Sequence, residues 1–250
     1  MLSLHTQDSV FSLRHAPSWL SLAASAGAVN AVGFIACSRF VTHVTGTVSR
    51  IGIDAGASTT GAMALESAAV LGCLVMGAVT SAVLIDGRYH NGKRPLYAAP
   101  LFVVAALLTL LGALGSGGAF GAFGADIDGP RGVAFLSLLA FAMGLQNAAV
   151  ATSTGMIVRT THLTGSTTDL GVHLATALHT RGDVRRTALR HAALRVGKIT
   201  AFTAGAASGA VIAGALGFAA LFFPAAIVAG ATVLSFARTS VVAGEVAARA

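Results

Sequence analysis

Two segments of this 250-residue chain repeat the same polar residues at the same spacing. The first reads THVTGTVSRIG over residues 42–52, and the second reads THLTGSTTDLG over residues 161–171. Each follows a Gly-x-x-Asn-Ala sequence, at 27–31 and at 144–148. Hydroxyl groups, imidazoles, amides and the exposed N–H groups of a helix start can all bind a polar or anionic ligand. The two segments are therefore the first candidates for a functional site.

A short helix is expected to follow each Thr-His pair. The threonine before each glycine is the predicted N-cap, and the glycine allows a close approach or an unusual turn. The helix start then offers N–H groups and the positive end of its dipole, beside the hydroxyl that follows the glycine. We predict that the substrate-binding residues are Thr45, Gly46, Thr47, Thr164, Gly165 and Ser166, with Asn30, Gln146 and Asn147.

Each of these residues also has a simpler interpretation. The Thr-Gly segments could be capped linkers between two helices instead of re-entrant helices at a binding site. An amide inside an apolar helix needs a partner, which could be another helix or a substrate. Gln146 beside Asn147 favours the polar site in the second half.

The histidines extend the candidate site. His43 and His162 could carry protons, because histidine titrates near neutral pH, and Asp169 completes a predicted polar relay. The alternative is a hydrogen-bonded residue at a helix end. We expect no metal and no other cofactor, because the sequence lacks a ligand motif such as HExxH or CxxC. We assign no catalytic residue, because no nucleophile elbow surrounds Ser166.

The composition indicates what must position these residues. Hydrophobic residues make up 55% of the chain and charged residues 10%, with a mean hydropathy of +0.79. Soluble domains carry roughly 25% charged residues. The chain is therefore predicted to be a polytopic membrane protein, which excludes a soluble enzyme, a secreted disulfide scaffold and a disordered chain. Cys37 and Cys73 lie in apolar stretches and are not expected to form a disulfide.

A helix needs about 20 apolar residues to cross the bilayer. Six stretches of the chain meet this length and predict an all-α bundle. We expect a single transmembrane domain over 19–238, preceded by a cytoplasmic N-terminal segment at 1–18 and followed by a cytoplasmic tail at 239–250. The first span is expected to be a retained helix, because part of it recurs later in the chain. The six qualifying stretches are 19–38, 63–85, 95–115, 133–153, 196–215 and 218–237.

Lys and Arg residues predict the orientation. With a cytoplasmic N-terminus, all but Arg39, Arg50 and Arg131 of the 16 basic residues fall on the inner side, so both termini should be cytoplasmic. The basic run 181–198 is interpreted as a topogenic loop, or as a site for anionic lipid. Nucleic-acid binding is not expected, because no aromatic residues are interleaved to stack on bases.

The repeated motifs divide the spans into two halves. MGAVTSAVL at 76–84 also parallels AGAASGAVI at 204–212. Each half, about 19–115 and 133–237, holds three spans, so the second half must enter from the opposite side. Many secondary transporters are built from such inverted repeats, with the substrate near the bilayer midplane.

The long motif GLQNAAVATSTGMIVRTTHLTGSTTDLG, together with THVTGTVSRIG, resembles the YoaK family of bacterial membrane proteins. The resemblance covers residues 17–238, and it implies a bacterial inner-membrane protein with about six helices but no established substrate. Members of that family often have Asp at the position of Asn30 and Asn at that of Thr47, which puts proton coupling through Asn30 in doubt. The matching positions are Gly144, Gln146, Asn147, Arg159, Thr160, Thr161, His162, Thr164 and Gly165.

The sequence therefore favours a secondary transporter of a small polar or anionic metabolite, bound between the two Thr-Gly motifs. The alternatives are a membrane-embedded enzyme and a non-catalytic partner or sensor subunit. The expected partners are the lipid bilayer and a small-molecule substrate, and a homo-oligomer is compatible with the sequence.

Overall fold

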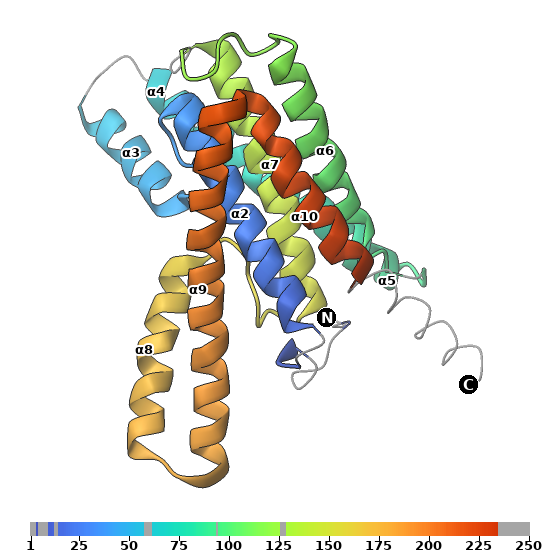
Figure 1. Ribbon diagram of the computed structural model, residues 1–250, viewed down its shortest axis with the longest axis vertical. Helices are drawn as coiled ribbons and strands as arrows, with labels where there is room; N and C mark the ends of the chain where they lie inside the picture. The colour runs from blue at the N-terminus through green and yellow to red at the C-terminus, as the bar shows by residue number, and fades with distance from the viewer. Residues whose placement is uncertain are drawn as a thin grey trace.

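A computed structural model describes residues 4, 10–12, 15–57, 62–93, 95–125 and 129–234. The described part of the chain is helical and contains no strand (Figure 1). Its elements are α2 (Ala16–Cys37), α3 (Val44–Gly56), α4 (Ala62–Ala82), the π-helix η1 (Val83–Gly87), α5 (Arg88–His90), α6 (Ala99–Ser116), α7 (Pro130–Ser153), α8 (Leu163–His179), α9 (Gly182–Leu216), the 3-10 helix η2 (Gly217–Leu221) and α10 (Phe222–Thr232).

Five helical stretches in the described residues are long and apolar enough to cross a membrane. The first four match predicted spans, whereas the last two predicted spans fall within one stretch, Gly182–Thr232. The chain reverses inside this stretch at Gly217, whose φ of 57° favours glycine, and α10 has only 11 residues. The end of the sixth predicted span, the tail at 239–250 and most of segment 1–18 lie outside the described residues.

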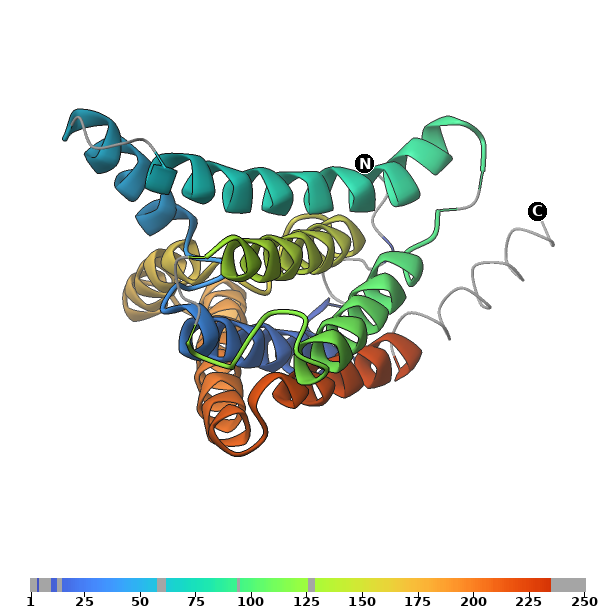
Figure 2. The ribbon, with the colours of Figure 1, turned by 90° about the horizontal axis from the view of Figure 1, so that it is seen from above.

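Two helix pairs make the most extensive contacts in the bundle, α2 with α9 and α4 with α7 (Figures 1 and 2). Both pairs approach backbone to backbone at glycine. A methyl group on Gly27 would overlap the carbonyl oxygen of Phe202 in α9, and one on Gly144 would overlap that of Leu74 in α4. Small residues therefore permit the close packing that membrane helices use in place of a hydrophobic driving force.

The bundle buries one set of apolar side chains and exposes another. Trp19, Leu22, Phe135 and Met143 are among the largest fully buried side chains. By contrast, α4 exposes a row of apolar side chains that a water-soluble surface would not carry, and lipid is the medium that suits them. Those on α4 that are about half exposed or more are Met63, Leu65, Val75, Met76 and Val79.

The two repeated motifs begin helices at mid-height of the bundle (Figure 1). After α2, the chain turns back through Ser38 (φ 51°) and starts α3; after α7, it turns back through Met156 (φ 70°) and starts α8. α3 and α8 then run toward opposite ends of the molecule (Figure 1). Positive φ is unusual for residues other than glycine, so both reversals depend on the surrounding packing.

The basic segment 181–198 is helical and not the predicted loop, because α9 begins at Gly182. Its Ala, Leu and Arg residues favour helix, and Asp183 lies in the first turn, where a negative charge is stabilising. With 35 residues, α9 is about 52 Å long at 1.5 Å per residue, against about 30 Å for the hydrocarbon core. Its first half forms a hairpin with α8 that extends beyond the other helices (Figure 1).

Candidate functional site

Asn30 holds the first reversal in place. Its Oδ1 accepts a hydrogen bond from the Thr42 backbone N–H at 3.1 Å, and its Nδ2 donates to the Ala26 carbonyl and the Thr42 Oγ1, both at 2.9 Å. The side chain is only 4% exposed. Asn30 therefore satisfies a backbone donor that the reversal would otherwise bury, and its amide is already engaged without a ligand.

Asn147 makes the corresponding contact in the second half. Its Oδ1 accepts from the Thr161 backbone N–H at 3.3 Å. The neighbouring Gln146 is fully buried and faces α2, where its Nε2 donates to the Leu22 carbonyl at 3.0 Å and to Thr160 Oγ1 at 3.3 Å. Gln146 therefore contributes to helix packing and is not among the residues that line the central cavity, so its role as a substrate ligand stays a prediction.

The histidines, and not the threonines, occupy the N-cap positions. α3 begins at Val44 after His43, and α8 begins at Leu163 after His162, so Thr45 and Thr164 are wrong as predicted N-caps. Both histidines lie in tight turns in which the following N–H bonds back two residues, Val44 to Thr42 at 3.0 Å and Leu163 to Thr161 at 3.1 Å. This turn ends before the threonine, which is therefore already helical.

Each motif glycine accommodates the ring of its own histidine. A methyl group at Gly46 would lie 2.6 Å from the His43 ring, and one at Gly165 would overlap the His162 ring. Glycine thus leaves the space in which the imidazole folds over the first turn, and a larger residue would displace the ring. The sequence predicts that another group approaches each glycine closely. In the structure that group is the histidine ring of the same motif.

The hydroxyl groups that follow the glycines are engaged within their own helices. Thr47 Oγ1 donates to the His43 carbonyl at 3.0 Å, and Ser166 Oγ donates to the His162 carbonyl at 2.8 Å. Neither side chain lines the central cavity described below. Thr47 and Ser166 therefore bond within their own helices, and their predicted role as donors to a ligand stays a prediction.

A cavity of about 720 Å³ lies where the two motifs meet. Its walls come from α2, α3, α4, α7, α8 and α9 together with both reversals, and its size is that of a small-molecule pocket. Most of the wall is apolar, with polar groups concentrated at the two helix starts. The predicted residues that line it are Asn30, His43, Thr45, Asn147, His162 and Thr164.

Two residues outside the predicted set give this cavity its charge and shape. Arg159 is an exposed residue on its wall, two residues before Thr161. Phe40, two residues before Thr42, occupies the matching place in the first half and stacks on Phe34 with ring centroids 4.5 Å apart. Arg159 belongs to the motif that resembles the YoaK family, and its position just before the repeated Thr-His pair could have identified it.

A buried lysine fixes the second motif. Lys198 of α9 is 4% exposed, and its Nζ donates to the Arg159 and His162 carbonyls, both at 2.9 Å, and to Ser166 Oγ. Nearby, Arg195 pairs with Asp169 at 3.3 Å. Asp169 therefore joins α8 to α9 by an ion pair, and its predicted part in a polar relay with His162 stays a prediction. Sequence reasoning missed Lys198 because it treated the residue as part of a topogenic run.

Ser166, His162 and Asp169 do not form a catalytic relay in this geometry. Ser166 bonds the backbone of His162 and not its ring, while Asp169 faces Arg195. Among the described residues, no three His, Cys, Asp or Glu side chains gather where they could hold a metal ion. Neither Cys37 nor Cys73 is in a disulfide.

The apolar helices and the all-helical bundle define a multi-pass membrane protein. Over residues 19–234 the sequence matches a family described as protein of unknown function, DUF1275, and the chain belongs to that family. The resemblance to the YoaK family is consistent with this membership. No curated protein and no solved structure matches the chain.

Proposed function

We propose that the chain consists of two inverted repeats of one three-helix design. Corresponding glycines support this: Gly27 and Gly144 each meet a backbone carbonyl three residues before another glycine, Gly205 and Gly77. In each case the first helix of one half packs on the second helix of the other half. The Asn-to-Thr tethers and the histidine turns also match between the halves. In a membrane, such repeats are typical of secondary transporters.

We further propose that the protein is a secondary transporter of a small polar or anionic metabolite. The observation that carries this proposal is the central cavity, whose polar groups come from both halves of the chain, from Asn30 and Asn147 and from the starts of α3 and α8. Both helix starts direct N–H groups and a positive dipole end toward it, and Arg159 adds a full positive charge. An anionic group is therefore the best electrostatic match, and rocking of the two halves would alternate its access.

Cysteine accessibility tests this proposal. Thr45 and Thr164 line the cavity and are exposed, so Thr45→Cys and Thr164→Cys should react with a membrane-impermeant thiol reagent in a Cys37→Ala/Cys73→Ala background. We expect both to react through the same water-filled cavity, and a bound substrate to protect both. If neither cysteine reacts from either side, the cavity is closed to water, and a partner or sensor subunit becomes the better interpretation.

We propose an orientation in a bacterial inner membrane with both termini cytoplasmic. In that orientation the α8–α9 hairpin extends into the cytoplasm. Its tip carries Arg181, Arg185, Arg186 and Arg190, all exposed, so anionic lipid headgroups are a suitable partner. Thermal unfolding in nanodiscs would test this: anionic lipid should stabilise the natural chain more than a variant with these four arginines changed to glutamine.

A further inference from the structure

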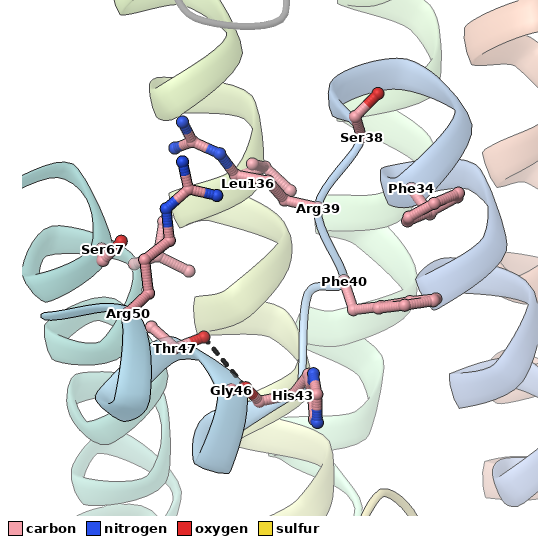
Figure 3. Close-up of a pocket in the computed structure, with 11 residues that line it drawn as sticks. Phe34, Ser38, Arg39, Phe40, His43, Gly46, Thr47, Arg50, Ser67 and Leu136 are labelled. Carbon is pink, nitrogen blue, oxygen red and sulfur yellow. Dashed lines mark hydrogen bonds between the residues drawn. The ribbon is translucent and has the colours of Figure 1, made fainter. Parts of the chain in front are cut away.

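A second cavity, of about 290 Å³, lies outside the central one on the first-half side. It is lined by residues from the end of α2, the first reversal, α3, α4 and α7, and it shares Phe34, Phe40 and His43 with the central cavity. Figure 3 draws the side chains of Arg39 and Arg50 toward one side of the view, and those of Phe34 and Phe40 toward the other. The cavity is thus charged at one end and aromatic at the other.

The second half fills the corresponding place with its own side chain. When MGAVTSAVL at 76–84 is aligned with AGAASGAVI at 204–212, Val70 on the wall of this cavity corresponds to Lys198. The ammonium group of Lys198 occupies the space beside His162 and Ser166. Valine is too short to reach that far. The first half therefore keeps an open space beside His43 and Thr47, where the second half is closed by lysine.

The same comparison identifies an excess of positive charge. Arg50 corresponds to Asp169, and Ser67 on α4 corresponds to Arg195, so the ion pair of the second half is replaced by an arginine facing a serine. Arg50 forms no ion pair with any described carboxylate, and its Nη2 lies 3.2 Å from the sulfur of Met63. A guanidinium group offers five N–H donors, most of which remain available here.

The other arginine of the cavity is partly neutralised. Arg39 Nη1 pairs with Glu66 at 3.0 Å, and this contact directs the guanidinium group toward the cavity. Arg50, by contrast, pairs with no described carboxylate, so its charge makes an anionic group the suitable ligand for this end of the cavity.

We infer that this cavity binds a carboxylate with a small apolar body. The carboxylate oxygens would be held by Arg50 and Arg39, with the Ser67 hydroxyl near them. The apolar body would lie against Phe34, Phe40 and Leu136. Guanidinium groups match the two oxygens of a carboxylate in a planar, bidentate geometry, and the cavity volume is at the lower end of that of small-molecule sites. The inference does not depend on transport.

Titration calorimetry on the purified full chain in detergent tests the inference, with benzoate as the probe. Benzamide, which has the same shape without the charge, should not bind measurably, and acetate should bind more weakly than benzoate. Arg50→Gln should weaken benzoate binding by about tenfold or more, because a charge-assisted interaction is lost. Arg131→Gln, an equal change at an exposed arginine outside the cavity, should leave binding unchanged.

Two further variants separate this site from the central cavity. Val70→Phe fills the space without changing the charge, and it should weaken benzoate binding while Arg50 is intact. Arg159→Gln changes only the central cavity and should have no effect. The inference is overturned if benzamide binds as well as benzoate, if Arg50→Gln binds normally, or if Arg159→Gln alone abolishes binding. A thermal melt of each variant establishes that a loss of binding is not a loss of folding.

Discussion

At the scale of single residues, Asn30 and Asn147 attach each chain reversal to the helix that precedes it. We predict that Asn30→Leu destabilises the protein by about 1–3 kcal/mol, because the Thr42 N–H loses its acceptor in a buried place. Asn30→Asp should cost less, since the Oδ acceptor remains. Loss of helical circular dichroism on heating would measure both. Equal melting temperatures for the natural chain and Asn30→Leu would mean that the tether contributes nothing.

Lys198 carries the second residue-scale prediction. Lys198→Met removes the donor to the Arg159 and His162 carbonyls, and we expect a loss of about 1–3 kcal/mol from the unsatisfied acceptors. Val70→Met is the matched change at the corresponding position of the first half, where no such donor is removed, and it should be near neutral. Thermal melts of the two variants give the comparison. A Lys198→Met protein as stable as Val70→Met would contradict the role given to the ammonium group.

The sequence could predict the residues around the cavity better than their roles. Repetition identified Asn30, His43, Asn147 and His162, and all four line the central cavity. Repetition could not separate a side chain that faces the central cavity from one whose hydroxyl bonds within its own helix, as that of Thr47 does. That distinction depends on where the helix starts, and a one-residue shift of the start rotates every later side chain by about 100°.

At the scale of helices, the pairing of α2 with α9 and of α4 with α7 depends on glycine. We predict that Gly27→Ala and Gly144→Ala both destabilise the bundle, and by similar amounts, because each methyl group meets a backbone carbonyl that cannot move alone. Gly72→Ala in α4 and Gly214→Ala in α9 have open space around the new methyl group. These controls should be neutral or gain about 0.5–1 kcal/mol from helix propensity.

Thermal melts in one detergent would compare these four glycine variants. Unchanged stability in Gly27→Ala would show that α2 and α9 can separate without cost. A large loss in Gly144→Ala alone would mean that the two interfaces are not equivalent.

Membrane helices can be predicted from the length of apolar stretches in the sequence. This prediction succeeds where the stretch is apolar throughout, as in α6 and α7. It fails where one helix is apolar over only half its length. α9 continues from the basic hairpin into the bundle, and the charges at 181–198 concealed that continuity. The short α3 and α8 were expected from the motifs, but their opposite directions follow from the packing of whole helices.

At the scale of the whole molecule, the opposite directions of α3 and α8 lead to a topological prediction. The ends of these helices, Gly56 and Leu178, are exposed and lie toward opposite ends of the bundle (Figure 1). In a Cys37→Ala/Cys73→Ala background, Gly56→Cys should react with an impermeant thiol reagent only from outside the cell. Leu178→Cys should react only in inside-out vesicles, and Arg181→Cys at the hairpin turn is the control for that side.

The physical reason is that a half with three crossings must begin the next half on the opposite side, so matched helices have opposite orientations in the bilayer. A mass shift of the labelled protein measures the reaction in each type of vesicle. Labelling of Gly56→Cys and Leu178→Cys from the same side would exclude the inverted repeat. Alternating access between matched halves would then have no structural basis, whereas the carboxylate site of the first half would still be testable by calorimetry, because it depends on local charge and not on topology.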